Sequence, residues 1–330
     1  MDDELHMRRA VGNADTVRVH TSPNPWVGAV LVTSDGRVFD GATEPPGGRH
    51  AEIVALHAAR AAGADTTGAT LYTTLEPCSH TGRTPPCTDA LVAAGIARVV
   101  SSVDDPDPQV AGEGHRRLTH AGIDVMSGVL ALEVARQLRP YLHHRRTGRP
   151  YVVLKLAATL DGRTAAADGT SQWITGETAR TAAHRLRAES DAIIVGAGTV
   201  RIDDPSLTTR LVDGPSPRRI VLGRVPESAK VHPCTEWNGS LEELLTTLGS
   251  DGVLQAMVEG GPTVAASFHR AGLVDRYVMH LAPSFMGGDD GTPLLRGPGA
   301  ATIGDLTTLR FVSTRQLGDD IEVVLEKNPS

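Results

Sequence analysis

Hydrophobic and polar positions along the first half of the chain predict strands and helices in turn. Residues 27–42 predict two strands around Ser34-Asp35-Gly36, because Asp-Gly is a common hairpin turn. Helical spacing of apolar residues follows over 51–62. The next predicted elements are a strand at 69–75, a helix from near Cys87, a strand at 97–103 and a helix near 113–121. This alternation predicts a β-sheet covered by helices.

The second half of the chain repeats the alternation after a short basic stretch. It opens with a strand over Tyr151 to Ala157. The other predicted elements are a helix near 177–188, strands at 191–197 and 218–223, a helix at 241–249, a strand at 252–260, a helix at 262–272 and β-rich segments at 274–282 and 309–325. Because 330 residues exceed the usual size of a single core, we expect two domains, residues 1–147 and 150–330.

Composition and charge narrow the class of protein. No apolar run approaches the roughly 20 residues of a membrane span, and the acidic N-terminus lacks the apolar stretch of a secretory signal. We therefore expect a soluble, cytoplasmic protein without a membrane partner. The net charge of -7 disfavours a nucleic-acid partner, and the basic cluster at 143–149 is interpreted as a solvated joint between the domains. The sequence leaves open whether the chain forms a homo-oligomer.

Two short motifs in the first half carry metal-ligand chemistry. His50-Ala51-Glu52 is followed by Pro77-Cys78 and then by Cys87. One imidazole and two thiolates are three ligands, the number that a catalytic zinc uses when a fourth position is left for water. Glu52 is predicted to be the catalytic base that passes a proton to departing ammonia. Zinc-dependent base deaminases carry the signature H-x-E and P-C-x-x-C. This chain has the H-x-E and the P-C pair but departs in the spacing, because Cys87 comes nine residues after Cys78.

Other interpretations of these residues stay open. Both cysteines could be small buried hydrophobic residues, with His50 a polar group at a helix start. A closed structural zinc site needs a fourth protein ligand, for which His80 is the candidate, and would make the protein a non-catalytic zinc scaffold. A nucleoside or RNA deaminase with an accessory domain would use the same ligands, although the acidic charge counts against it.

The whole chain resembles the bifunctional deaminase-reductases of riboflavin biosynthesis. The resemblance rests on PNP-x-VG, HAE, EPCSH-x-GRTPPC and DP-x-PQVAG in the first half, and on LDGRTA, SQWIT, DDP-x-LT and EGGPT in the second. It implies a three-layer cytidine-deaminase-like α/β domain followed by a dihydrofolate-reductase-like α/β domain. It also implies zinc-dependent hydrolytic deamination of 2,5-diamino-6-ribosylamino-4(3H)-pyrimidinone 5′-phosphate. NADPH-dependent reduction of 5-amino-6-ribosylaminouracil 5′-phosphate to the ribityl compound would follow.

For the deaminase half, the resemblance implies zinc on His50, Cys78 and Cys87, with Glu52 as the proton shuttle. The implied substrate-binding residues are Asn24, His80 and Arg83. Of these, Arg83 is expected to meet the phosphate, which a guanidinium fork suits. Two positions depart from the family pattern: Thr43 stands where a histidine is common, and Asp107 replaces an asparagine.

The second half holds two glycine-rich segments that could bind phosphate. The segment 195–201 looks like a dinucleotide fingerprint, but Arg201 occupies the third glycine position, which disfavours a Rossmann fold. The segment 259–263 is the better candidate, because its glycines precede a helix that opens at Pro262 and whose first amides could hold a pyrophosphate. The alternative is that these glycines only make a tight turn.

For the reductase half, the resemblance implies NADPH as cofactor and a phosphorylated pyrimidine as small-molecule substrate. The implied cofactor-binding residues are Ala157, Trp173, Thr199, Asp203, Gly261, Pro262, Thr263, Val264, Ala265, Ala266 and Ser267. The implied substrate-binding residues are Ser171, Arg187, Leu207, Arg210 and Glu259. Lys155 has two open interpretations: it orients the nicotinamide or sugar, or it is an edge lysine that faces solvent. No role is assigned to Cys234.

Overall fold

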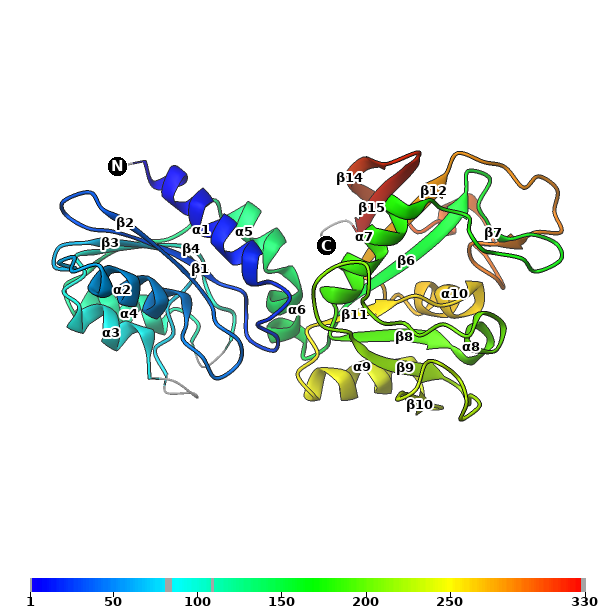
Figure 1. Cartoon of the computed structure of the whole chain (residues 1–330), viewed down its shortest axis with the longest axis horizontal. Helices are drawn as coiled ribbons and strands as arrows, with labels where there is room; N and C mark the ends of the chain where they lie inside the picture. Colours follow the sequence, from blue (N-terminus) through cyan, green and yellow to red (C-terminus); the bar gives the residue numbers. More distant parts are fainter. Residues whose placement is uncertain (1, 81–84, 108–109, 328–330) are drawn as a thin grey trace. The chain divides into compact units, whose positions relative to one another are not determined.

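The chain folds into two compact units. The computed structural model describes residues 2–80, 85–107 and 110–327. Its internal contacts divide the chain into Met1–Gly148 and Arg149–Ser330, which we call the first and second unit (Figure 1). Within the described residues, no helix is both long and apolar enough to cross a membrane.

The first unit is built on one five-stranded sheet in the order β2-β1-β3-β4-β5. The strands β1 and β2 pair antiparallel as a hairpin, as predicted, and β3, β4 and β5 run parallel. Its elements in chain order are α1 (Asp3–Val17), β1 (Gly28–Val32), β2 (Val38–Ala42), α2 (Ala51–Ala61), β3 (Thr70–Leu75), α3 (Cys87–Ala93), β4 (Arg98–Val103), α4 (Glu113–His120), β5 (Asp124–Met126), α5 (Ala131–Gln137) and α6 (Arg139–Thr147).

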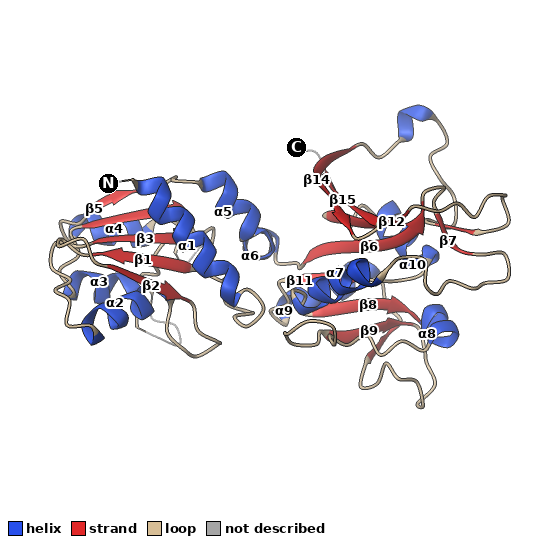
Figure 2. Cartoon of the chain, turned by 45° about the horizontal axis from the view of Figure 1, so that its top comes forward, coloured by secondary structure: helices blue, strands red, loops and turns tan. Residues whose placement is uncertain are grey.

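Helices cover both faces of this sheet and make three layers. Figures 1 and 2 show α1 and α5 on one face, and α2, α3 and α4 on the other. Every residue of β1 and β3 is therefore buried, which explains the continuous apolar run of β1. The fully buried Met7 and Ala10 of α1 pack on Val30 and Tyr72 of the sheet. The predicted zinc ligands of this unit lie at or near the ends of its helices and strands.

The basic cluster at 143–149 is not a solvated joint, and that interpretation is wrong. Most of it belongs to α6, the last helix of the first unit. His144 is only 8% exposed, and Tyr141 is also buried. The helix ends at Gly148, whose φ of 69° is the left-handed conformation that glycine adopts readily. The cluster therefore belongs mostly to a packed helix, on which Arg146 is exposed and Arg145 is only partly exposed.

The second unit is built on one eight-stranded sheet in the order β10-β9-β8-β11-β6-β12-β15-β14. Its elements in chain order are β6 (Tyr151–Thr159), β7 (Arg163–Ala165), α7 (Glu177–Ala188), β8 (Ala192–Gly196), α8 (Ala197–Asp203), β9 (Arg218–Leu222), β10 (Thr235–Trp237), α9 (Leu241–Ser250), β11 (Gln255–Val258), α10 (Pro262–Arg270), β12 (Arg276–Ala282), β13 (Thr292–Pro293), η1 (Ile303–Asp305), β14 (Leu309–Leu317) and β15 (Asp320–Lys327). The strands from β10 to β12 run parallel, and β15 and β14 are antiparallel to their neighbours.

Alternate residues of the central strands pack against helices on opposite faces. Leu154 and Ile194 belong to one core cluster with Leu244 of α9 and Phe268 of α10. The neighbouring residue Ile193 belongs to a cluster on which Leu186 of α7 packs. Because β6, β8 and β11 run parallel, their carboxyl ends lie at one edge of the sheet, where open parallel sheets bind ligands.

Candidate active sites

Three ligand atoms of the predicted zinc site meet in the first unit. His50 is the N-cap residue of α2, Cys87 is the first residue of α3, and Cys78 lies in the loop after β3. The ligand atoms of these three residues all lie within 4.8 Å of one another. His80 is not part of this cluster, so among the described residues the fourth ligand of a closed site is absent.

The spacing of these atoms fits a tetrahedral zinc ion. Such an ion, at its usual bond lengths, holds a nitrogen and a sulfur ligand about 3.6 Å apart. His50 Nδ1 lies 3.2 Å from Cys87 Sγ and 3.5 Å from Cys78 Sγ. Three ligands of the soft and borderline type that zinc prefers leave one coordination position open.

The local electrostatics favour a thiolate in this cluster. Hydrogen bonding from Cys87, and from His50, lowers the pKa of the Cys78 thiol to about 4. The hydrogen bond to Cys78 in turn raises the pKa of His50 to about 8. The Cys87 backbone N–H also donates to Cys78 Sγ, at 3.3 Å. A buried thiolate that is stabilised in this way is a good metal ligand.

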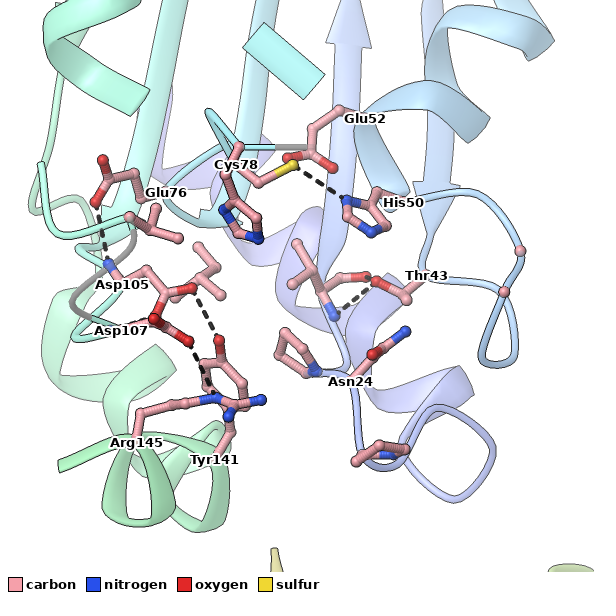
Figure 3. A pocket seen from close by; sticks show the side chains of 18 residues that line it. Asn24, Thr43, His50, Glu52, Glu76, Cys78, Asp105, Asp107, Tyr141 and Arg145 are labelled. Carbon is pink, nitrogen blue, oxygen red and sulfur yellow. Dashed lines mark hydrogen bonds and ion pairs between the residues drawn. The ribbon is translucent and has the colours of Figure 1, made fainter. Parts of the chain in front are cut away.

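Glu52 lies in the first turn of α2, two residues after the ligand His50. It is only 3% exposed, and burial raises the pKa of its carboxyl group. Figure 3 shows its carboxylate beside Cys78 and at the end of the pocket where His50 lies. The side chain therefore reaches the metal cluster without being one of its ligands.

A pocket of about 310 Å³ opens in front of the cluster. Asn24 and His80, which the resemblance assigns to the substrate, line it together with Glu52. Thr43 lines it too, and its hydroxyl accepts a hydrogen bond of 3.2 Å from the Val27 N–H instead of presenting an imidazole. Arg83 lies outside the described residues.

Sequence reasoning missed another wall of this pocket. It is formed by Tyr141 and Arg145 of α6 with Asp105 and Asp107 of the loop after β4 (Figure 3). The sequence around these residues does not predict that they line the pocket, because they come from segments far from the zinc motifs. The one available signal was the family's DP-x-PQVAG motif, which contains Asp107.

The second unit brings several predicted substrate residues together. Arg187 of α7 donates two hydrogen bonds to Glu259, Nε to Oε2 at 2.8 Å and Nη2 to Oε1 at 3.0 Å. Lys155 Nζ lies 3.9 Å from Glu259 Oε1. Burial would raise the pKa of Glu259, but the charges of Arg187 and Lys155 lower it. Lys155 lies on the central strand β6 with its side chain 11% exposed, so the solvent-facing interpretation is wrong.

The glycines of the 259–263 segment have packing roles. A Cβ on Gly260 would approach Val264 of α10 to 2.8 Å, so a side chain there would push the helix from its place. The Gly261 N–H donates to Thr199 Oγ1 at 3.1 Å, which links the start of α10 to α8. Neither glycine has a positive φ, so a left-handed turn is not the reason for them.

Other predicted reductase residues lie in different surroundings within the second unit. Arg210 donates its backbone N–H to His184 Nδ1 at 3.1 Å, and its side chain is exposed. Leu207 is buried, whereas Trp173 is 65% exposed beneath Arg180. His184, which sequence reasoning missed, lies between Arg187 and Arg210. Burial and these arginines lower its pKa to about 4.

Comparison with known protein families assigns a class to each unit. Residues 1–103 match the cytidine and deoxycytidylate deaminase zinc-binding region, and residues 150–323 match the RibD C-terminal domain. The fold and the sites thus define a zinc-binding deaminase unit followed by a reductase unit. The predicted fold class and the predicted zinc cofactor are confirmed.

Relatives match the chain over nearly its full length. The riboflavin biosynthesis protein RibD of Escherichia coli (strain K12) is 40% identical, covering 97% of this chain and 98% of the relative. RibD of Mycobacterium tuberculosis (strain ATCC 25618 / H37Rv) is 43% identical, and the match covers 96% of this chain and 94% of the relative. The solved structure of Acinetobacter baumannii RibD has a TM-score of 0.91 at 34% identity, and the match covers 99% of both chains.

A deaminase and reductase from Thermotoga maritima matches at a TM-score of 0.90 and 33% identity, covering 99% of both chains. That structure is titled a diaminohydroxyphosphoribosylaminopyrimidine deaminase/5-amino-6-(5-phosphoribosylamino)uracil reductase. The present chain belongs to the RibD family of riboflavin biosynthesis proteins. The predicted family and the predicted bifunctional enzyme class are confirmed.

Proposed function

We propose that the first unit deaminates 2,5-diamino-6-ribosylamino-4(3H)-pyrimidinone 5′-phosphate, and that the second reduces the ribosyl group of the product with NADPH. The observation that carries the proposal is the three-ligand cluster with Glu52 beside it at the end of a pocket. The Thermotoga maritima title names these two reactions for a protein with the same fold. The proposed partners are therefore small phosphorylated pyrimidines, which suits the net charge of -7 better than nucleic acid does. A cytoplasmic location stays a prediction, and the oligomeric state stays open.

In the deaminase, His50, Cys78 and Cys87 would hold zinc, which supplies a polarised water of lowered pKa. Glu52 would accept a proton on its carboxylate and pass it to the leaving amine. Asn24 and His80, which line the pocket, orient the pyrimidine ring. The Nδ1 of His80 is buried and has no hydrogen-bond partner among the described residues.

In the reductase, NADPH would supply the hydride that reduces the ribosyl group when it is bound. Glu259, held by Arg187 and Lys155, lies directly after β11 at the carboxyl edge of the sheet. We assign the sugar and phosphate of the substrate to this group with Arg210 and Ser171, because arginines provide the counter-charge of a phosphate. We assign the cofactor to residues 261–267 at the start of α10, with Ala157, Trp173, Thr199 and Asp203.

Incubation with the diamino-pyrimidinone phosphate tests both steps. Without NADPH, mass spectrometry should show loss of the amine and release of ammonia. With NADPH, the ribityl compound should form and NADPH absorbance should fall. Ammonia release from RNA or free nucleosides, with none from this substrate, would contradict the proposal.

A further inference from the structure

His184 of α7 is a buried imidazole among the residues that we assign to the reductase substrate. Its side chain is 4% exposed and lies one turn before Arg187 on the same helix. Two donors face the ring nitrogens of His184. The Arg210 backbone N–H donates to Nδ1 at 3.1 Å, and Arg187 Nη1 lies 3.5 Å from Nε2. The ring is therefore bound to a loop on one side and faces a guanidinium on the other.

The hydrogen bond from Arg210 fixes which nitrogen of the imidazole carries the proton. Burial, together with the charges of Arg187 and Arg210, lowers the pKa of His184 to about 4, so the ring is neutral at neutral pH. A neutral imidazole has one N–H group and one nitrogen that accepts a hydrogen bond. Because Nδ1 accepts from the Arg210 backbone, the proton is on Nε2.

The Nε2–H group of His184 therefore lacks an acceptor among the described residues. The atom that faces it, Arg187 Nη1, belongs to a guanidinium, which only donates hydrogen bonds. This Nη1 also donates to the Thr208 carbonyl at 3.2 Å, and the other two nitrogens of Arg187 donate to Glu259. Buried N–H groups in native proteins are nearly always paired. The unpaired group thus indicates that an acceptor from outside the chain binds here.

The neighbouring charges favour an anionic acceptor. Glu259 neutralises Arg187 through two hydrogen bonds. In the part of the chain that the structure describes, Arg210 has no carboxylate partner, and its Nη1 donates to the neutral Ser206 Oγ at 3.3 Å. Its positive charge is felt at His184, whose pKa it helps to lower. A phosphate oxygen is charged and only accepts hydrogen bonds, which fits these donors better than a hydroxyl group that must also donate.

We propose that the Nε2–H group of His184 donates a hydrogen bond to the 5′-phosphate of the reductase substrate, beside Arg187 and Arg210. The inference rests on the proposed function, because it requires a phosphorylated ribosyl substrate in the second unit. His184 then has two tasks: Nδ1 holds the Arg210 backbone, and Nε2 binds the ligand. A neutral donor between two guanidinium groups adds a hydrogen bond without the repulsion that a third positive charge would bring.

Two variants separate these tasks, because each amide side chain replaces one of the two ring nitrogens. In His184→Gln, the amide nitrogen can occupy the position of Nε2 and keep the donor to the ligand. In His184→Asn, the shorter side chain places its oxygen near the position of Nδ1 and keeps only the acceptor for the Arg210 N–H.

NADPH oxidation is measured with 5-amino-6-ribosylaminouracil 5′-phosphate and with the same compound lacking the phosphate. Loss of a hydrogen bond to a charged group should raise the KM of His184→Asn for the phosphorylated compound at least about tenfold, while kcat changes little. The KM of His184→Gln should stay within about threefold of the wild type, because the donor is kept. The KM for the compound without phosphate should change little in both variants.

Matched measurements separate this effect from misfolding. Arg185→Ala, a control at the next position of α7 whose side chain is exposed, should match the wild type. The KM for NADPH and the rate of ammonia release should be unchanged in all variants. An equal rise of KM for both compounds, or a His184→Gln variant that is impaired more than His184→Asn, would overturn the inference. A wild-type protein that oxidises no NADPH with the deaminated compound would instead refute the proposed function.

Discussion

At the scale of single residues, Glu52 and the zinc ligands occupy one site but have separable tasks. We expect Glu52→Gln to keep the metal, since the glutamate is not one of the clustered ligands. Deamination should fall by about two to four orders of magnitude, the usual contribution of a general acid-base group. Zinc analysis and ammonia release on the same sample check this. Loss of zinc from Glu52→Gln would mean that the carboxylate is a ligand.

Cys87 gives the complementary prediction. Cys87→Ser should bind zinc poorly, because a hydroxyl is a much weaker zinc ligand than a thiolate. Cys234→Ser is the matched control, since Cys234 is a free cysteine of the second unit and lies outside the cluster. Metal content measured after dialysis should fall only in Cys87→Ser. Equal zinc in both variants would contradict the three-ligand assignment.

Arg210 tests the assignment of the reductase site. Arg210→Ala should raise the KM for the ribosyl substrate by about tenfold and leave the KM for NADPH nearly unchanged, because we assign its side chain to the substrate. Its side chain is exposed, so the fold should tolerate the change. Arg185→Ala, another exposed arginine, serves as the control. A larger effect on NADPH would assign Arg210 to the cofactor.

The zinc ligands were predictable from the sequence, whereas the α6 wall was not. Cysteine is rare in this chain, so two cysteines spaced after H-x-E carry much information. Arg145 has no such signal, because arginine is common and a cluster of charges usually faces solvent. The burial of Lys155 could not be predicted from the sequence either. The central position of β6 depends on strand order, which periodicity does not report.

At the scale of elements, Glu76 fixes the loop that carries Asp105 and Asp107. Its carboxylate accepts N–H groups from Asp105 at 3.2 Å, Gly112 at 3.0 Å, Gly114 at 2.9 Å and His115 at 3.3 Å. The last three of these amides lie at the start of α4, where an anion is favoured. The glutamate before Pro77-Cys78 thus connects the end of β3 to the opposite wall of the pocket.

Removing this carboxylate should therefore destabilise the first unit. We expect Glu76→Ala to cost about 3 kcal/mol of unfolding free energy, because several buried N–H groups lose their acceptor. Denaturant unfolding measures the change. Glu113→Ala, which removes only an exposed ion pair with Arg116, should cost less than about 1 kcal/mol. Equal costs in the two variants would show that the Glu76 bonds contribute little.

Most elements with strong periodicity were predicted, and those missed have physical reasons. The helix α7 begins and ends where its pattern indicated. The helix α1 was overlooked although Asp2 caps it and Met7, Ala10, Val11 and Ala14 are buried at helical spacing. In α6, the apolar face is interrupted by histidines, one of which is buried, so periodicity alone could not find it.

At the scale of the whole molecule, two separate units should allow the two reactions to be stopped independently. A strong chelator should abolish deamination, since the zinc ligands all lie in the first unit. The same sample should still oxidise NADPH at nearly its original rate when supplied with the deaminated ribosyl compound. Absorbance and ammonia assays check both rates, and circular dichroism checks the fold. Loss of both rates with an intact fold would show that zinc serves reduction as well.

The position of α6 also decides where the polypeptide can be divided. The region matched to other deaminases ends at residue 103, but side chains up to Arg145 line the pocket. A shortened enzyme designed on the matched region alone would lose a wall of its own binding site. Gly148, which ends α6, is the earliest place for a cut that keeps this wall. Anyone fusing the deaminase to another catalyst should therefore join the new partner after this glycine.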